Sequence, residues 1–92
     1  MGKLILGALA GIDAEKTGAN IRALRKSIGM TQEELAGILG ISTTALKKWE
    51  RGDTICSSVH LADLTVIFDV KPSDILCITA EDVVFMVYFH YN

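Results

Sequence analysis

The sequence has few of the residues that hold small secreted proteins together. Its 92 residues include only two cysteines and two histidines. Two cysteines cannot form the multi-bridge framework of a secreted miniprotein, and the spacings of the cysteines and histidines match no usual zinc site. We therefore interpret all four residues as structural or incidental, and we predict no metal or other cofactor. They are Cys56, His60, Cys77 and His90.

Long apolar runs are also missing, although half of the residues are hydrophobic and the mean hydropathy is +0.37. No run approaches the roughly 18 to 20 residues that span a bilayer, so no membrane partner is predicted. The segment from Lys3 to Gly11 loosely imitates a signal peptide, but it has a single basic residue and an acid-containing helical sequence follows it. We expect a cytoplasmic protein whose surplus apolar residues are buried, for example against a second copy of the chain.

Positive charge is scarce in the second half of the chain. Residues 17–53 contain six basic and four acidic residues, whereas the residues from Thr54 onward contain one basic and five acidic residues. An anionic partner would therefore bind the first half. The length suits one small domain with a single core and is too short for two domains with a linker.

The first predicted helix covers residues 18–28. Thr17 is its predicted N-cap, and Gly29 ends it. Its apolar residues recur at i, i+3 and i+7, which places them on one face. These residues are Ile21, Leu24 and Ile28, and the basic residues beside them are Arg22, Arg25 and Lys26.

Two short helices follow, and each begins after a hydroxyl residue and ends at a glycine. Thr31 caps the second helix, Glu34 completes a capping box three residues later, and Gly40 ends the helix. Ser42 caps the third helix, and Gly52 ends it. The predicted inner faces are Leu35, Ala36 and Leu39 in the second helix, and Ala45, Leu46 and Trp49 in the third.

The rest of the chain predicts two more helices and a strand. A fourth helix fits residues 58–69, and a fifth begins at Pro72 and ends near Cys77. Five short helices with tight turns predict an all-α bundle. Residues 83–91 are β-branched and aromatic without helical periodicity, which predicts a strand. Its partner would be Leu4–Leu6 or the same strand of a second subunit.

Residues 32–49, QEELAGILGISTTALKKW, resemble the helix-turn-helix of the phage-repressor, Cro-like family, which is often called Xre-type. In that family a glutamine opens the second helix, a small residue lies mid-helix, a glycine makes the turn, and apolar residues fill fixed positions around them. The matching residues here are Gln32, Ala36 and Gly40, with Leu35, Leu39, Ile41, Leu46 and Trp49. Physical chemistry agrees, because two helices joined by a short turn need a small residue at their contact and a flexible one in the turn.

The resemblance extends from Thr17 to Leu76 and implies a five-helix, lambda-repressor-like bundle. We expect residues 17–78 to form the helix-turn-helix domain. Residues 1–16 would form an N-terminal apolar arm, and residues 79–92 a C-terminal strand that could serve as a dimerisation arm. The family pattern does not cover these two terminal segments.

Geometry and the resemblance together predict a DNA interface. A short helix fits the major groove with its N-terminal residues facing base edges, which favours three residues of the third helix for base contact. These residues are Thr43, Thr44 and Lys47. Two phosphate contacts, Thr31 and Gln32, are implied by the family, and Lys48 and Arg51 are predicted from charge and position.

The resemblance also implies an ion pair between Arg25 and Glu50, which would fix the C-terminal end of the third helix, the helix predicted to enter the major groove. Arg22 and Lys26 are then left near phosphate or in water. Such an ion pair would make Arg25 a structural residue and would neutralise the acid closest to the predicted DNA surface.

The leading hypothesis is a sequence-specific, double-stranded DNA-binding regulator that acts as a homodimer. The dimer would form through the C-terminal strand or through a second apolar stripe on the fourth helix, Val59, Ala62 and Val66. One alternative is an antitoxin-type autoregulator whose terminal arm binds a protein partner. Another is a protein-interaction module that kept the fold without DNA binding. An enzyme is not predicted, because no catalytic constellation or phosphate loop is visible.

Overall fold

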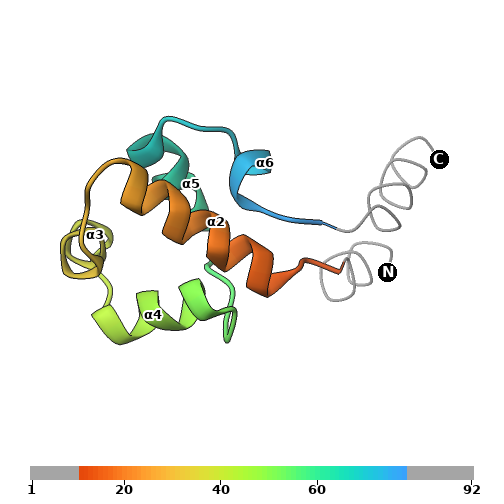
Figure 1. Ribbon diagram of the computed structural model, residues 1–92, viewed down its shortest axis with the longest axis horizontal. Helices are drawn as coiled ribbons and strands as arrows, with labels where there is room; N and C mark the ends of the chain where they lie inside the picture. The colour runs from red at the N-terminus through yellow and green to blue at the C-terminus, as the bar shows by residue number, and fades with distance from the viewer. Residues whose placement is uncertain (1–10, 79–92) are drawn as a thin grey trace.

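The computed structural model describes residues 11–78, which form five α-helices and confirm the predicted all-α bundle (Figure 1). The predicted strand at residues 83–91 and its suggested partner Leu4–Leu6 lie outside these residues. Within residues 11–78, no helix has the length and apolar character needed to cross a membrane. The helices are α2 (Ala14–Ser27), α3 (Gln32–Leu39), α4 (Thr43–Arg51), α5 (Ser58–Phe68) and α6 (Pro72–Ile75).

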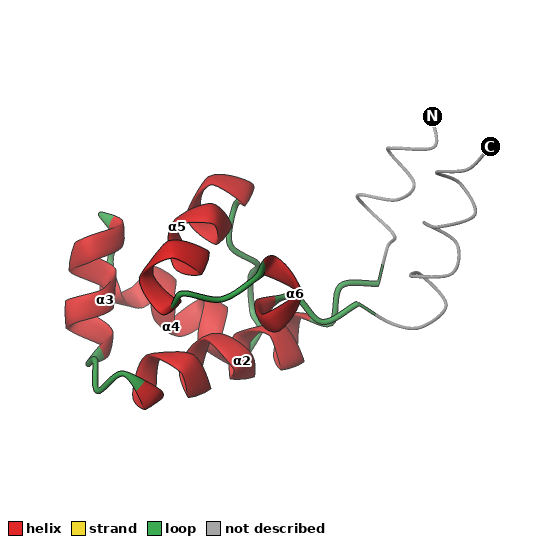
Figure 2. Cartoon of the chain, turned by 90° about the horizontal axis from the view of Figure 1, so that it is seen from above, coloured by secondary structure: helices red, strands yellow, loops and turns green. Residues whose placement is uncertain are grey.

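The helices are arranged around α2. Helix α4 lies along one side of α2 and α6 packs on the other, while α3 lies against α4 and α5 against α6 (Figure 1). Viewed from above, α3 lies at the end of the molecule opposite the point where the described chain begins and ends (Figure 2). Helix α3 is therefore far from the two ends of the described chain, whereas α4 ends against the first turn of α2, where Gly52 approaches the backbone of Glu15.

The hydrophobic core draws on all five helices. The largest fully buried side chains are one from each helix: Ile21, Leu35, Leu46, Leu64 and Ile75. Ala36, Leu39, Trp49 and Phe68 complete this cluster. The predicted inner faces of α3 and α4 are confirmed, except that Ala45 is only half-buried. Because no pair of helices forms a core alone, loosening one helix exposes part of the whole cluster.

The start of α2 differs from the prediction. The helix begins at Ala14, and its N-cap is Asp13, whose side chain accepts a hydrogen bond from the backbone N–H of Lys16. Thr17 was wrongly predicted as the cap: it lies inside the helix, is buried, and accepts a hydrogen bond from the N–H of Cys77 at 2.9 Å. A hydroxyl that binds a distant backbone group resembles a cap in sequence, because both roles select threonine.

The predicted caps of the next two helices are confirmed. Thr31 and Glu34 form the capping box of α3, and the Ser42 side chain accepts a hydrogen bond from the N–H of Ala45. Gly40 ends α3 with φ of 71°, a left-handed conformation that a side chain would disfavour. This turn fixes the direction in which α4 leaves α3.

Two polar contacts, besides that of Thr17, attach the C-terminal end of α6 and the residues after it to the N-terminal half of α2 and its cap. The N–H of Asp13 donates to the carbonyl of Cys77 at 2.7 Å, and the Asn20 side chain donates to the carbonyl of Ile75 at 2.9 Å. Ile12 and Ile78 form an isolated antiparallel β-bridge beside them. Helix α6 ends at Ile75, two residues before the predicted end near Cys77.

Helices α2 and α4 approach each other closely at Gly18. A Cβ atom on Gly18 would overlap the carbonyl oxygen of Trp49 and lie 2.8 Å from that of Glu50. The Trp49 ring of α4 also packs against His60 of α5, with ring centroids 5.3 Å apart. Helix α4 thus packs with its inner face mainly against α2 and α3, which leaves its outer face to solvent.

Candidate nucleic-acid interface

The outer face of α4 presents most of the predicted base-contacting residues. Thr44, Lys47 and Lys48 are exposed, and Thr43 is half-buried at the start of the helix. Leu46, Trp49 and Glu50, which are buried, point the other way. The helix is nine residues long and capped at both ends, so its outer face is a short, rigid surface that suits insertion into a groove.

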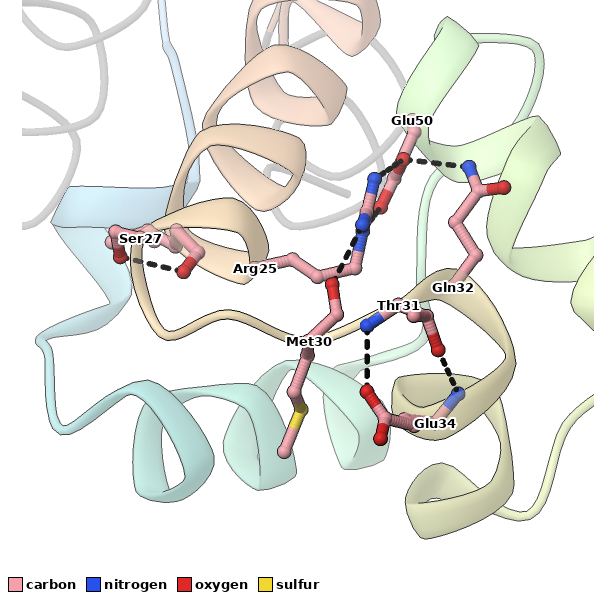
Figure 3. A network of polar contacts seen from close by, with 8 residues as sticks. Arg25, Ser27, Met30, Thr31, Gln32, Glu34 and Glu50 are labelled. Atoms are coloured by element: carbon pink, nitrogen blue, oxygen red, sulfur yellow. Dashed lines mark hydrogen bonds and ion pairs between the residues drawn. The ribbon is translucent and has the colours of Figure 1, made fainter.

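Arg25 and Glu50 form a buried ion pair between α2 and the end of α4 (Figure 3). The Nε of Arg25 donates to Oε2 of Glu50 at 2.7 Å, and Nη2 donates to Oε1 at 3.0 Å. Their side chains are 8% and 3% exposed. The hydrogen bonds to Glu50 raise the pKa of Arg25 above its ordinary value and outweigh the effect of burial. The guanidinium therefore stays charged and balances the carboxylate.

The ion pair is part of a larger network that reaches α3 (Figure 3). Nε2 of Gln32 donates to Oε1 of Glu50 at 2.9 Å, and Nη1 of Arg25 donates to the carbonyl of Met30 at 2.8 Å. A carboxylate only accepts hydrogen bonds, so the amide nitrogen of Gln32 must face Glu50. One N–H of that nitrogen is used in this way, and the second remains available to a ligand.

Thr31 is exposed at the N-terminus of α3, and its backbone and hydroxyl groups both take part in the capping box. Its N–H donates to Oε1 of Glu34 at 2.8 Å, and its Oγ1 accepts from the N–H of Glu34 at 3.0 Å. The hydroxyl hydrogen of Thr31 has no role in this motif. Thr31 can therefore donate to a phosphate oxygen without breaking the cap.

An open groove of about 530 Å³ lies where α2, α3 and α4 meet. It collects four of the predicted DNA-contacting residues, Thr31, Gln32, Lys47 and Arg51, together with the network residues Arg25, Met30 and Glu50 and with Arg22 of α2. Thr43, Thr44 and Lys48 do not line it. The predicted site residues thus fall into two groups, a groove and the adjacent outer face of α4.

Arg51 is less free than its charge suggested. Its Nη2 lies 2.8 Å from Oδ2 of Asp53, and its Nε donates to the same oxygen at 2.9 Å. Both side chains are more than half exposed, so the pair is weak and solvent competes with it. A phosphate could displace Asp53 from Arg51.

Sequence reasoning did not find two features of this site. The link from Gln32 to Glu50 joins residues 18 positions apart, and no local pattern indicates it. The groove position of Arg22 depends on how α2 crosses α4, which is set by the close approach at Gly18. The sequence left Arg22 either near phosphate or in water, and its place one helical turn before Arg25, on the same face, was the signal that favoured the groove.

The cysteines form no site within residues 11–78. Cys56 and Cys77 are free and half-buried. Burial raises the pKa of the Cys56 thiol and outweighs a backbone hydrogen bond that acts in the opposite direction, so the thiol is protonated at neutral pH. In this part of the chain no group of three His, Cys, Asp or Glu residues is placed to hold a metal ion.

Comparison with known proteins finds a helix-turn-helix family and several HTH-type transcriptional regulators. A family described as helix-turn-helix matches residues 21–75. An uncharacterized HTH-type transcriptional regulator of Bacillus subtilis, YazB, is 36% identical over 64 residues, which cover 70% of this chain and 93% of YazB. The antitoxin PezA of Streptococcus pneumoniae is 37% identical over 59 residues, 64% of this chain and 37% of PezA.

Other matches come from a longer protein and from a solved structure. PH1808 of Pyrococcus horikoshii, named for an inferred role as an HTH-type transcriptional regulatory protein, is 37% identical over 83 residues. These residues cover 87% of this chain but only 26% of PH1808. The restriction-modification controller protein C.AhdI of Aeromonas hydrophila has a similar fold, with a TM-score of 0.63 and 32% identity over 68% of this chain and 96% of that chain.

Proposed function

Because the chain belongs to the Xre/Cro-like helix-turn-helix family of DNA-binding transcriptional regulators, we propose that it binds double-stranded DNA sequence-specifically and regulates transcription. The observation that carries the proposal is the groove beside α4, where cationic and hydrogen-bonding side chains from three helices converge. The outer face of α4 would lie in the major groove of the DNA. A cytoplasmic location is part of the proposal, and catalytic activity is not.

Three residues of α4 would read bases: Thr43, Thr44 and Lys47. The exposure of Thr44 and Lys47 supports this role. Thr43 is next to the N-cap Ser42, at the N-terminal end of α4, which would enter the major groove of the DNA. Threonine offers one hydroxyl and a methyl group that can meet the methyl of thymine. Its readout is therefore less restrictive than that of arginine or glutamine.

Four residues would hold the DNA backbone: Thr31, Gln32, Lys48 and Arg51. The free hydroxyl hydrogen of Thr31 and the second N–H of Gln32 support their roles as donors to phosphate. The exposure of Lys48 and Arg51 supports theirs. These contacts would set the position of α4 on the duplex without reading its sequence.

The proposal predicts binding to a mixed-sequence DNA duplex that weakens steeply with salt. The logarithm of the binding constant should fall linearly with the logarithm of salt concentration, by a slope of about −0.9 per phosphate contact. Lys48→Ala should make this slope shallower by about 0.9, because it removes one such contact. Fluorescence anisotropy over a salt series measures both.

A matched control is Lys71→Ala, which removes the same charge from an exposed position before α6, outside the proposed interface. Its slope should equal that of the unmodified protein. Absence of binding at low salt would remove the DNA hypothesis and favour the protein-interaction module. If the protein does bind the mixed duplex, selection of bound sequences from a random DNA pool would identify its operator.

We further propose that the protein binds DNA as a homodimer through α5. Val59 and Val66 are 69% and 80% exposed, and their i, i+7 spacing places them on one face of the helix. Two half-sites about 34 Å apart require two-fold symmetry, which a dimer supplies. The competing interface is the strand predicted at residues 83–91, which lies outside residues 11–78.

Val66→Asp should therefore shift the protein toward monomer, because a carboxylate on this face would be desolvated in the dimer. A chain truncated after Ala80 should remain dimeric. Sedimentation velocity of both proteins over a range of concentrations measures the effect. The reverse result, with a dimeric Val66→Asp protein and a monomeric truncated chain, would assign the interface to residues 81–92.

A second candidate function is that of an antitoxin-type autoregulator, which the similarity to PezA favours. The same DNA interface would then control the protein's own operon, and a protein partner would bind the C-terminal segment 79–92. Growth arrest on expression of a neighbouring gene alone, relieved by co-expression of this chain, would distinguish the antitoxin from a plain regulator.

A further inference from the structure

The groove between α2, α3 and α4 carries more positive charge than the predicted contacts use. Three exposed cationic side chains line it, Arg22 from α2 and Lys47 and Arg51 from α4. Glu50 is the single acidic residue among the lining residues. An anion entering the groove would therefore meet cations on two sides.

The carboxylate of Glu50 does not cancel this charge. Oε2 of Glu50 accepts from Nε of Arg25, and Oε1 accepts from both Nη2 of Arg25 and Nε2 of Gln32. The buried Arg25 neutralises Glu50, so the pair forms an uncharged floor to the groove. Above this floor an anion meets the positive charges of Arg22 and Lys47, the charge of Arg51, which Asp53 offsets in part, and the donors at the start of α3.

Arg22 has no ion-pair partner among residues 11–78. It lies one turn before Arg25 on α2, so its side chain is on the helix face that borders the groove. An arginine can grip a phosphate through two parallel N–H groups, which makes it better suited to this task than a point charge. Lys26, on the same helix, is also exposed but does not line the groove.

We propose that Arg22 binds a DNA backbone phosphate in this groove, so that the phosphate is held jointly from α2, α3 and α4. The inference rests on the proposed DNA-binding function and extends the interface to a helix outside the helix-turn-helix. Its physical consequence is that α2, which already fixes α4 through Arg25, also fixes the protein on the duplex.

The test measures the binding of a short mixed-sequence DNA duplex over a salt series for Arg22→Ala and Lys26→Ala. Arg22→Ala should weaken binding at low salt and make the slope shallower by about 0.9, the value for one lost phosphate contact. Lys26→Ala should keep the original slope. Arg22→Lys should restore the slope, because it retains the charge, while binding more weakly than arginine through the loss of the two-pronged contact.

The outcomes separate this inference from the function on which it rests. If the unmodified protein does not bind the duplex at low salt, the proposed function fails and this inference fails with it. Suppose that the unmodified protein binds and that Lys48→Ala makes the salt slope shallower. If Arg22→Ala then keeps the original slope, as Lys26→Ala should, only the inference about Arg22 is wrong. Urea unfolding of both variants should match that of the unmodified protein, since both side chains are exposed, and this match excludes misfolding as the cause.

Discussion

Arg25→Ala is expected to lower the free energy of unfolding by about 3–5 kcal/mol, the cost of leaving a buried charge without its partner. The change would leave the 3% exposed side chain of Glu50 with one neutral donor, Gln32. It would also leave the carbonyl of Met30 without its side-chain donor. Urea denaturation followed by circular dichroism measures the change.

Two control variants test whether burial is the cause. Arg51→Ala breaks an ion pair whose side chains are 60% and 52% exposed, and it should cost less than about 1 kcal/mol. The double variant Arg25→Met, Glu50→Leu removes both buried charges together and should recover most of the stability, because no unpaired charge remains. A loss of under about 1 kcal/mol for Arg25→Ala would show that the buried carboxylate finds water or another partner.

Gly18→Ala is the second change with a large expected effect, and it should destabilise the protein by about 2–3 kcal/mol. The added Cβ would overlap the carbonyl oxygen of Trp49 and crowd that of Glu50. Both obstacles are backbone atoms of a helix, which cannot rotate away as a side chain can. Alanine normally favours a helix over glycine by about 1 kcal/mol, and the steric cost must exceed this gain. Thermal and urea unfolding measure the sum.

Gly37→Ala supplies the matched control in α3. This glycine is exposed inside a helix, and a Cβ there would meet nothing within 4 Å. The same substitution should therefore stabilise the protein by roughly 0.5–1 kcal/mol. If both alanine variants were stabilising, α2 and α4 would have to be farther apart than the structure places them.

The parts of the fold that depend on neighbouring residues could be predicted from the sequence. The capping box of Thr31 and Glu34 and the turn at Gly40 each depend on residues within one or two helical turns. The inner faces of α3 and α4 followed from helical periodicity. Thr17 shows the limit, because its hydroxyl binds Cys77, 60 residues away, and local rules assigned it to a cap.

The candidate site divides in the same way. The residues on the outer face of α4 could be predicted, because a helix fixes which side chains share a face. The groove could not, since it arises from the packing of three helices, and the hydrogen bond from Gln32 to Glu50 and the position of Arg22 follow from that packing. Arg51 shows a third case, because its partner Asp53 is only two residues away but lies beyond the end of α4, where helical periodicity does not indicate which side chains meet.

The bridge between Ile12 and Ile78 holds the two ends of the described chain side by side. The described chain begins and ends at the same place, and three hydrogen bonds secure that closure by joining the cap and N-terminal half of α2 to Ile75 and Cys77. Helix α3 lies at the opposite end of the molecule from these two chain ends (Figure 2). A bundle closed in this way can be attached to other segments at either end and still turn the same face outward. That property suits a unit that corresponds to only 26% of the length of a relative such as PH1808.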